Sequence, residues 1–401
     1  MSKKEVITFP RDLLSASIDE RVRYFRGAII GHPSIDNAQK ELLSAISMAT
    51  PDSLIFVFGP AGVGKSTLCN STTNKIITEL LPSLKSDKER IPIVSIELPA
   101  PGPRKFDWRE TFRLLLYELQ EPLIDRKRTP QTNHDLDPNW GSGNKLSSTL
   151  RFANRKPAVN DYRHSYETSL RHRRPVAVLL DDAHYLSKVS GGDLLSQLDL
   201  VKSLASRSGI PHVLFGTYEL LAMRNLSGQI SRRSVDIHLR RYTAEDTDQD
   251  TFASAVASLC ARMPLPNCPT LDDDSDYLFE RSAGCVGVLK TWMAKALHHA
   301  LSKGLPTVSL EHMEQQTYSD AALTQMLTEI VEGERRVDTG GSRYLEAKKQ
   351  FFGKEETGIL SSSQVEDKKP RQQKPRAKRR VGERWPKRDP IGTKSHLHVG
   401  A

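Results

Sequence analysis

The feature that most constrains this chain is a glycine-rich loop between a wholly apolar stretch and a helical one. Leu-Ile-Phe-Val-Phe at residues 54–58 leads into Gly-Pro-Ala-Gly-Val-Gly-Lys-Ser at residues 59–66. A continuous apolar run of this length is typical of a strand buried on both faces of a parallel sheet. Residues 66–81 then have helical spacing. The sequence therefore predicts a strand, a glycine loop and a helix in succession.

This pattern matches the Walker A motif, in which backbone N–H groups of the loop and the dipole of the following helix bind phosphate. We expect Lys65 to reach the β- and γ-phosphates of ATP and Ser66 to ligate Mg²⁺. The alternative, a glycine turn that only connects strand to helix, is disfavoured by the flanking elements. The predicted nucleotide-binding residues are Gly59, Pro60, Ala61, Gly62, Val63, Gly64, Lys65, Ser66 and Thr67.

A second apolar strand, residues 176–180, ends in two carboxylates and matches the Walker B motif. We expect Asp181 to hold Mg²⁺ and Asp182 to orient or deprotonate the attacking water. Alone, such a strand end is more often a solvated turn, but its pairing with the upstream loop favours the functional interpretation. A candidate strand at residues 91–98 lies between the two motifs. An intervening strand is typical of P-loop ATPases of the AAA+ and RecA-like branch.

Four further positions are candidates for the reaction. Thr217 follows the predicted strand at residues 212–215, where a polar side chain would position the lytic water, although it could simply cap the next helix. Arg232 or Arg233 would stabilise γ-phosphate charge on a neighbouring subunit, against the alternative of a solvated basic turn. Lys290, in a later helical stretch, is a candidate for the cation known as sensor 2.

Strands that alternate with helices predict an α/β fold with a doubly wound parallel sheet. From residue 243 the pattern is wholly helical, which predicts a small α-helical lid. We expect an N-terminal extension and helix at 1–50, an AAA+ core at 51–242 with an insertion near 125–157, a lid at 243–305, a helical segment at 306–340 and a basic, disordered tail at 341–401.

Net charge, cysteine spacing and the length of apolar runs limit the kinds of partner that this chain could bind. The formal net charge is +9, but residues 366–401 hold twelve Lys and Arg against four Asp and Glu, which leaves +1 for residues 1–365. Contact with DNA must then come from local patches. The four cysteines show no zinc spacing. No apolar run approaches the roughly 20 residues of a membrane span, so we expect no membrane partner and a soluble, cytoplasmic, nucleoid-associated bacterial protein.

With these motifs in order, the chain resembles the TnsC/TniB group of AAA+ transposition regulators, relatives of the MuB proteins. The resemblance covers roughly residues 20–335. Beyond the two Walker motifs, it depends on Phe-Gly-Thr-Tyr-Glu-Leu at 215–220, Gly-Gln-Ile-Ser-Arg-Arg-Ser at 228–234, the lid segment through Lys290 and the stretch at 326–334.

The resemblance implies an ATPase that polymerises on duplex DNA as a ring or helical filament, with six or seven subunits per turn. It implies two protein partners: a TnsA/TnsB-like transposase and a TniQ/TnsD-like target-selection protein, in a transposon that a CRISPR effector could guide. AAA+ ATPases usually have Glu where this chain has Asp182. Because this arm is one methylene shorter, we expect slow hydrolysis that acts as a timer and drives disassembly.

Two groups of basic residues are candidates for DNA contact, where loops of an oligomer could follow phosphates. A solvated charged face is the alternative for each. The first group is Arg104, Lys105 and Arg109. The second, in the expected insertion, is Arg126, Lys127, Arg128, Lys145, Arg151, Arg155 and Lys156.

Two other classes of protein share parts of this pattern. An initiator or helicase-loader ATPase has the same motifs and a lid, but usually carries a winged-helix domain after it, and only about thirty helical residues follow here. A nucleotide-gated signalling scaffold of the STAND type normally carries a long repeat array. Both are weaker predictions than the transposition ATPase.

Overall fold

The computed structural model describes residues 9–102, 106–127, 156–188, 194–225 and 234–352. Contacts divide the chain into two units, residues 1–346 and 347–401. The fold and the site described below belong to the first unit. Of the second, the structure describes only the end of a helix, up to Phe352.

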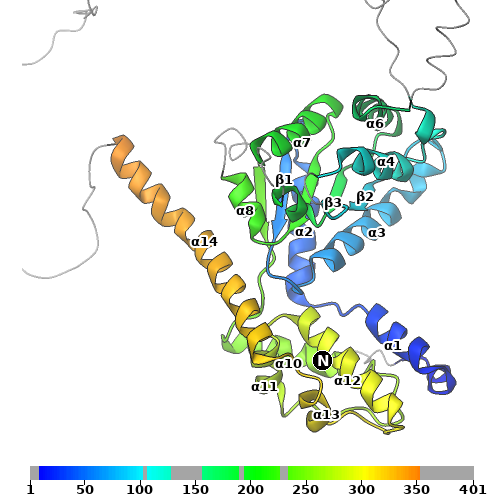
Figure 1. The fold of residues 1–401 in the computed structure, drawn as a ribbon, viewed down its shortest axis with the longest axis vertical. Helices are drawn as coiled ribbons and strands as arrows, with labels where there is room; N and C mark the ends of the chain where they lie inside the picture. Colours follow the sequence, from blue (N-terminus) through cyan, green and yellow to red (C-terminus); the bar gives the residue numbers. More distant parts are fainter. Residues whose placement is uncertain (1–8, 103–105, 128–155, 189–193, 226–233, 353–401) are drawn as a thin grey trace, which may run out of the picture. The chain divides into compact units, whose positions relative to one another are not determined.

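Five parallel strands form one sheet in the order β2-β3-β4-β1-β5 (Figure 1). The strands are β1 (Leu54–Phe58), β2 (Val94–Glu97), β3 (Val178–Asp181), β4 (His212–Gly216) and β5 (Ser234–His238). In register, Phe58 lies opposite Gly216 and His238, and Glu97 lies opposite Asp181. The residues that follow β1, β3 and β4 therefore meet at one edge of the sheet.

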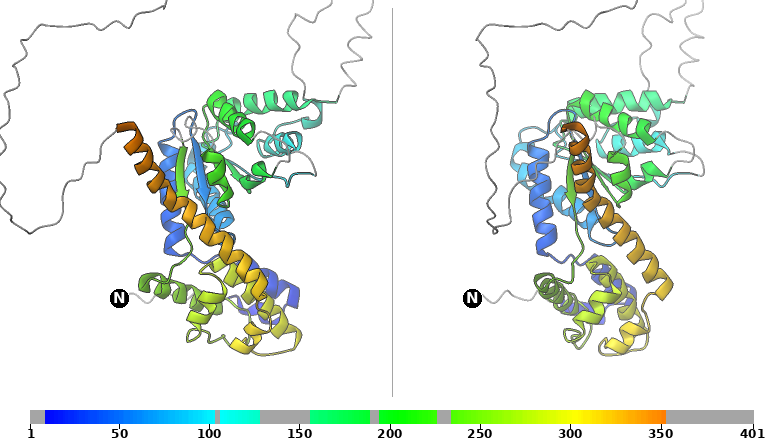
Figure 2. Two further views of the ribbon diagram at one scale, coloured as in Figure 1. Left: turned by 60° about the vertical axis from the view of Figure 1, so that its left-hand side comes forward. Right: turned by 90° about the vertical axis from the view of Figure 1, so that its left-hand side faces the viewer.

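Alternate residues of the strands serve two cores, one on each face of the sheet. Phe56 packs on the face covered by α4 (Trp108–Glu118), α6 (Val159–Arg173), α7 (Leu194–Ser208) and α8 (Glu219–Arg224). Ile55 and Val57 pack against α2 (Pro33–Ser47) and α3 (Lys65–Leu84) on the other face (Figure 2). This arrangement confirms the predicted α/β fold with a parallel sheet.

The strand predicted at residues 91–98 is shorter in the structure, Val94–Glu97. Pro92 has no N–H to donate, and its carbonyl accepts from the Val176 N–H at 2.9 Å. Proline in this position restricts regular ladder pairing to the residues that follow it. The strands predicted at 54–58, 176–180 and 212–215 lie within two residues of the observed β1, β3 and β4.

A separate core joins the helices that follow the sheet to the start of the chain. The core includes side chains from α10 (Asp246–Cys260), α11 (Ser275–Arg281), α12 (Val286–Ser302), α13 (Leu310–Glu314) and α1 (Ile18–Gly27). Trp292 is fully buried in it, and its indole N–H donates to the Met313 carbonyl at 2.7 Å. The expected N-terminal segment, residues 1–50, is thus shared: α1 packs in the helical lid and α2 packs on the sheet.

The last helix, α14 (Asp320–Phe352), is longer than the sequence predicts. A helical segment ending at residue 340 and a tail beginning at 341 were expected, and this boundary is wrong by twelve residues. Residues 343–352 are Arg-Tyr-Leu-Glu-Ala-Lys-Lys-Gln-Phe-Phe, most of which favour helix, so the two glycines at 340–341 do not end it. The remainder of the expected tail, 353–401, and the insertion residues 128–155 lie outside the described residues.

Candidate functional site: a phosphate loop between two pockets

The glycine loop after β1 turns through two left-handed residues. Gly62 has φ 74° and Gly64 has φ 112°, conformations that other residues adopt only with strain. The next residue, Lys65, begins α3, and its Nζ donates to the carbonyls of Gly59 at 3.0 Å and Pro60 at 2.7 Å. Lys65 is only 8% exposed, and burial lowers its pKa to about 8. The ammonium is therefore held tightly within its own loop.

Two carboxylates follow β3 at the same edge of the sheet. Asp182 adopts φ 54° and begins the short helix η4 (Ala183–Ser187), and its N–H donates to the Asp181 carboxylate at 2.9 Å. Both carboxylates act electrostatically on Lys65 and favour its charged form, although burial outweighs them. The structure thus brings the lysine and the two predicted carboxylates together.

The first pocket, of about 340 Å³, lies at the end of the loop near Pro60 and Ala61. Thr217 and His184 also line it. The Thr217 hydroxyl is buried and has no hydrogen-bond partner in the described part of the chain. Since buried hydroxyls are normally paired, a partner of Thr217 that enters through the pocket would satisfy it.

His184 is a pocket residue that the sequence analysis did not single out. Its Nδ1 lies 3.7 Å from a carboxylate oxygen of Asp182 and has no hydrogen-bond partner among the described residues. Burial lowers its pKa, so the imidazole is neutral near pH 7. The signal available in the sequence was its position, two residues after Asp182.

The second pocket, of about 60 Å³, lies on the lid side of the loop. The Gly287 N–H, in the first turn of α12, donates to the Gly62 carbonyl at 2.9 Å. A Cβ on Gly287 would lie 2.4 Å from that oxygen, so only glycine permits this approach. Further lining residues include Ile30, His32, Val63 and Val286. Most residues that line this pocket belong to two segments, 28–35 and 286–290. Of the residues in these segments, only Lys290 was predicted from the sequence as a site residue.

Lys290 lies at this second pocket, away from the carboxylates. Its Nζ donates to the carbonyls of Arg26 at 2.6 Å and Ala28 at 2.7 Å. These bonds join the lid helix α12 to the segment between α1 and α2. In this geometry Lys290 holds the wall of the lid-side pocket, and its amine is not directed at the phosphate loop.

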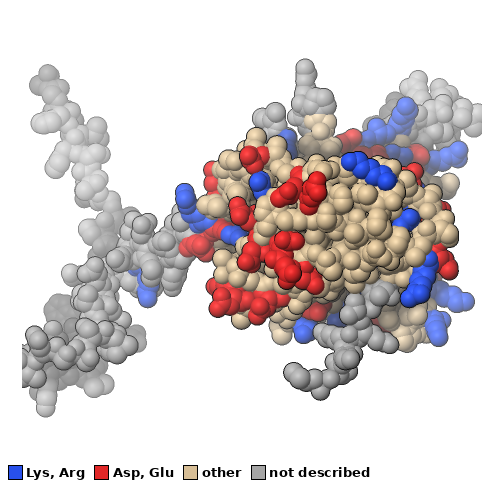
Figure 3. Space-filling view, turned by 90° about the horizontal axis from the view of Figure 1, so that it is seen from below, with Lys and Arg blue, Asp and Glu red and all other residues tan. Residues whose placement is uncertain are grey.

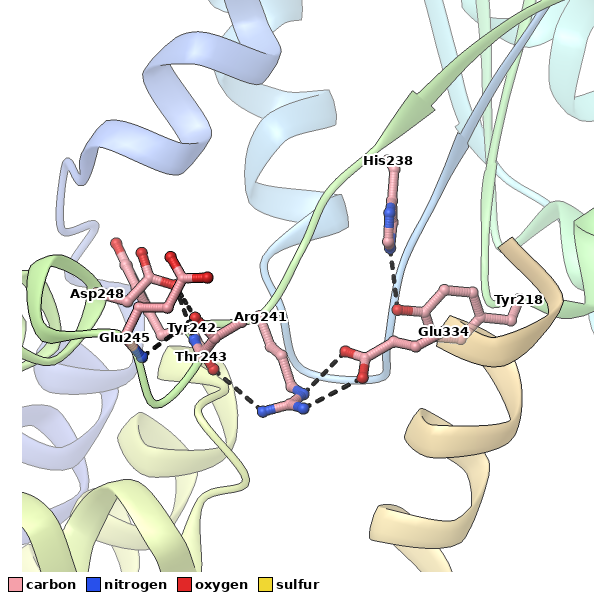
Figure 4. A network of polar contacts seen from close by, with 8 residues as sticks. All are labelled: Tyr218, His238, Arg241, Tyr242, Thr243, Glu245, Asp248 and Glu334. Carbon is pink, nitrogen blue, oxygen red and sulfur yellow. Dashed lines mark hydrogen bonds and ion pairs between the residues drawn. The ribbon is translucent and has the colours of Figure 1, made fainter. Parts of the chain in front are cut away.

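Helix α14 supplies one wall of the first pocket. Glu334 of this helix accepts from Arg241 in a bidentate ion pair (Figure 4), with oxygens 2.9 and 3.1 Å from the guanidinium nitrogens. Beside it, the Tyr218 hydroxyl lies 3.0 Å from His238 Nε2. No residue of this network was predicted as a site residue.

Of the predicted DNA contacts, Arg109, Arg126, Lys127 and Lys156 are described. Arg109 is exposed in the first turn of α4, 5.8 Å from the ring centre of Tyr162. Arg126 and Lys156 are also exposed, whereas Lys127 forms an ion pair with Glu121 at 2.7 Å. Other predicted site residues lie outside the described part of the chain, namely Arg104, Lys105, Lys145, Arg151, Arg232 and Arg233. Within the described residues, no three His, Cys, Asp or Glu side chains form a metal-binding group, and no helix is long and apolar enough to cross a membrane.

Residues 49–223, which include the loop, both carboxylates and Thr217, match the family model described as an AAA domain. This segment is an AAA-type P-loop ATPase domain. Such a domain has a nucleotide-binding fold, and the loop at 59–66 lies within the matched segment. No curated protein matches the chain.

Several solved structures resemble the chain, all at low identity. ORC2 of Aeropyrum pernix is 13% identical over 73% of this chain and 71% of that chain, with a TM-score of 0.47. ORC1 of A. pernix, solved in complex with DNA, is 14% identical over 78% and 70%, with a TM-score of 0.48. Domain III of the Thermotoga maritima replication initiation protein DnaA is 15% identical over 73% and 94%, with a TM-score of 0.40. These likenesses concern the fold alone.

Proposed function

We propose that this chain is an ATP-dependent, DNA-binding ATPase of the TnsC/TniB type, which assembles on duplex DNA and links a target-selection protein to a transposase. The observation that carries the ATPase part is the meeting of Lys65, Asp181 and Thr217 at one edge of the AAA domain. The transposition part, including both protein partners, rests on the resemblance of the sequence motifs.

In this proposal each side chain has a distinct task. Lys65 leaves the loop carbonyls and binds the β- and γ-phosphates of ATP. The Ser66 hydroxyl and the Asp181 carboxylate are oxygen ligands of the kind that Mg²⁺ takes together with substrate phosphates, and the metal would neutralise phosphate charge. Asp182 and the unpaired Thr217 hydroxyl hold the attacking water. A neighbouring subunit supplies Arg232 or Arg233.

The charge on the lid limits where DNA can bind. Asp246 and Asp248 lie in the first turn of α10, and Asp276 lies in the first turn of α11. Figure 3, seen from below, shows Asp and Glu side chains gathered on one part of this face. Because they repel phosphates, we assign DNA contact to the opposite, sheet-bearing part, where Arg109 is exposed.

The test is electron microscopy of the protein with ATP and duplex DNA, beside the Lys65→Ala variant. Regular rings or filaments in the first sample alone are expected; monomers in both would remove the proposal. Gel shifts with ATP, with ADP and without nucleotide complete the test. Binding that is ATP-dependent and indifferent to sequence is expected, whereas strong sequence preference would favour an initiator, and no DNA binding a signalling scaffold.

Single basic residues can be tested in the same gel shifts. Arg109→Ala should weaken binding to all sequences alike and reduce the slope of log affinity against log salt by about one. Arg23→Ala, which removes an exposed arginine from α1 in the lid, is the matched control and should change neither. Equal effects of the two variants would contradict the assignment of Arg109 to the DNA-binding surface.

A further inference from the structure

Helix α14 has two faces with different surroundings. Leu323, Met326, Ile330, Gly333 and Val337 recur at helical spacing, and each is buried or partly buried. On another face, Leu327 is 43% exposed and Val331 is 49% exposed. A helix with one covered apolar face and one exposed apolar pair is suited to more than one packing arrangement.

The covered face lies against the nucleotide site. Ile330 packs with Ala283 and Val288 in a small apolar cluster. Gly333 lies so close to Tyr218 that a Cβ there would meet the ring at 2.0 Å. The next residue, Glu334, forms the bidentate pair with Arg241. The helix thus lines the pocket together with Pro60, Thr217 and His184.

This contact is not continuous. The pocket of about 340 Å³ interrupts it, with Met326, Glu329, Ile330, Gly333 and Arg336 among the pocket's walls. The Arg241 and Glu334 side chains are 23% and 29% exposed, so water screens their attraction. The ion pair therefore adds little to the free energy that holds α14 in place.

We propose that α14 is a displaceable cover on the surface where a second copy of this chain docks. This inference rests on the proposed ATP-dependent assembly and adds a way in which that assembly is regulated. In the proposed assembly, an arginine of the neighbouring subunit reaches the γ-phosphate through the pocket beside Pro60, and α14 lines that pocket. In the single chain α14 blocks docking; in the assembly it swings away and the neighbour takes its place.

The first test uses Gly333→Ala. Alanine raises helix propensity by about 1 kcal/mol relative to glycine, so α14 stays helical, but the new Cβ collides with Tyr218. Thr328→Ala is the matched control, because it also favours helix and lies on the exposed face. Assembly is measured by sedimentation velocity over a range of protein concentrations, with a non-hydrolysable ATP analogue. We expect Gly333→Ala to lower the midpoint about tenfold, equal to about 1.4 kcal/mol, and Thr328→Ala to leave it unchanged.

The second test reverses charges. Glu334→Arg places like charges together and should lower the assembly midpoint, while Arg241→Glu combined with Glu334→Arg should restore the wild-type value. Hydrogen exchange across residues 323–337 should be faster in Glu334→Arg than in the wild type, because a helix with fewer buried contacts opens locally at lower free energy. The same acceleration should occur in the wild type when it assembles.

The outcomes separate this inference from the proposed function. Suppose that the wild type assembles with ATP, but neither variant shifts the assembly midpoint or α14 stays protected from exchange in the assembly. The proposal that α14 is a displaceable cover is then wrong, and the proposed function stands. If ATP hydrolysis falls in Glu334→Arg without any change in assembly, α14 instead positions Arg336 in the pocket of its own chain. The proposal that α14 is a displaceable cover is then also wrong. If the analogue binds and no sample assembles at any concentration, both proposals fail.

Discussion

The two sides of the phosphate loop differ in size, chemistry and origin. On the lid side, a pocket of about 60 Å³ is lined mainly by apolar side chains, with Gly287 bonded directly to the loop. On the other side, a pocket of about 340 Å³ combines Thr217 and His184 with charged residues of α14. A small, close-packed pocket is suited to holding a ligand in one position, and a larger polar one to admitting water and a second protein.

This contrast assigns different tasks to the two sides. Changes on the lid side should alter nucleotide affinity, whereas changes on the α14 side should alter turnover and assembly. Lys65 lies between the two pockets and should affect both. Four variants or conditions test this division.

The largest effect is expected from Lys65→Ala, because Lys65 lies between the two pockets and belongs to neither alone. Charge-assisted hydrogen bonds to phosphate are worth about 1.5–3 kcal/mol each, so ATP affinity should fall by about a hundredfold or more. Isothermal titration with ATP measures this loss. Because the Lys65 ammonium is buried, its removal should leave the melting temperature within a few degrees or raise it, which serves as the folding control. An affinity loss below tenfold would contradict the role of Lys65.

Thr217→Val tests the α14 side. The variant keeps the shape of the side chain and removes a buried hydroxyl that has no partner in the described part of the chain. We expect kcat to fall about thirtyfold, equal to about 2 kcal/mol, while ATP affinity and the free energy of unfolding change little. Steady-state phosphate release and titration with ATP measure the two quantities. A loss of affinity with unchanged kcat would reverse the division of tasks.

Gly287→Ala tests the lid side. The Cβ would lie 2.4 Å from the Gly62 carbonyl, and forcing a methyl into a packed contact destabilises by about 1–3 kcal/mol. ATP affinity should therefore fall about tenfold, with kcat at saturation less affected. Gly27→Ala is the matched control, because a Cβ at Gly27 would meet nothing within 4 Å. Equal losses in the two variants would show that the lid contact does not matter.

The smallest effect is a pH dependence of ATP binding. Burial lowers the pKa of Lys65 to about 8, so the ammonium predominates below that pH and the neutral amine above it. Phosphates favour the ammonium, and binding above pH 8 must take up a proton. Affinity should therefore fall as pH rises, about fivefold from pH 8 to pH 9. Lys65→Met, which has no amine to titrate, should bind weakly and show no such slope.

The sequence predicted best those elements whose signal is local. Ile55 and Phe56 belong to an unbroken apolar run, and such a run is explained only by burial on both faces of a sheet. The loop at 59–66 and the carboxylates after β3 likewise carry their chemistry in adjacent residues, so their meeting at one edge followed from parallel strand order.

What the sequence could not predict depends on contacts between distant segments. The approach of Gly287 to Gly62 and the pairing of Arg241 with Glu334 join residues far apart in the chain. Lys290 matched a position where a cation is useful, but the carbonyls of the 26–28 segment hold its amine. The helix predicted to end at residue 340 continues to Phe352, because residues 343–352 after the two glycines mostly favour helix.

The hydrogen bond from the Gly287 N–H to the Gly62 carbonyl also couples the orientation of α12 to the position of the loop. The helix has 17 residues and is therefore about 25 Å long, and its first turn is pinned to the phosphate loop. If α12 tilts by about 6° about its first turn, its far end moves by about 2.5 Å. Because α1 and α13 share a core with α12, they would travel with it. A change of a few tenths of an ångström at the loop would thus become a displacement at the rim of the lid large enough for another protein to sense.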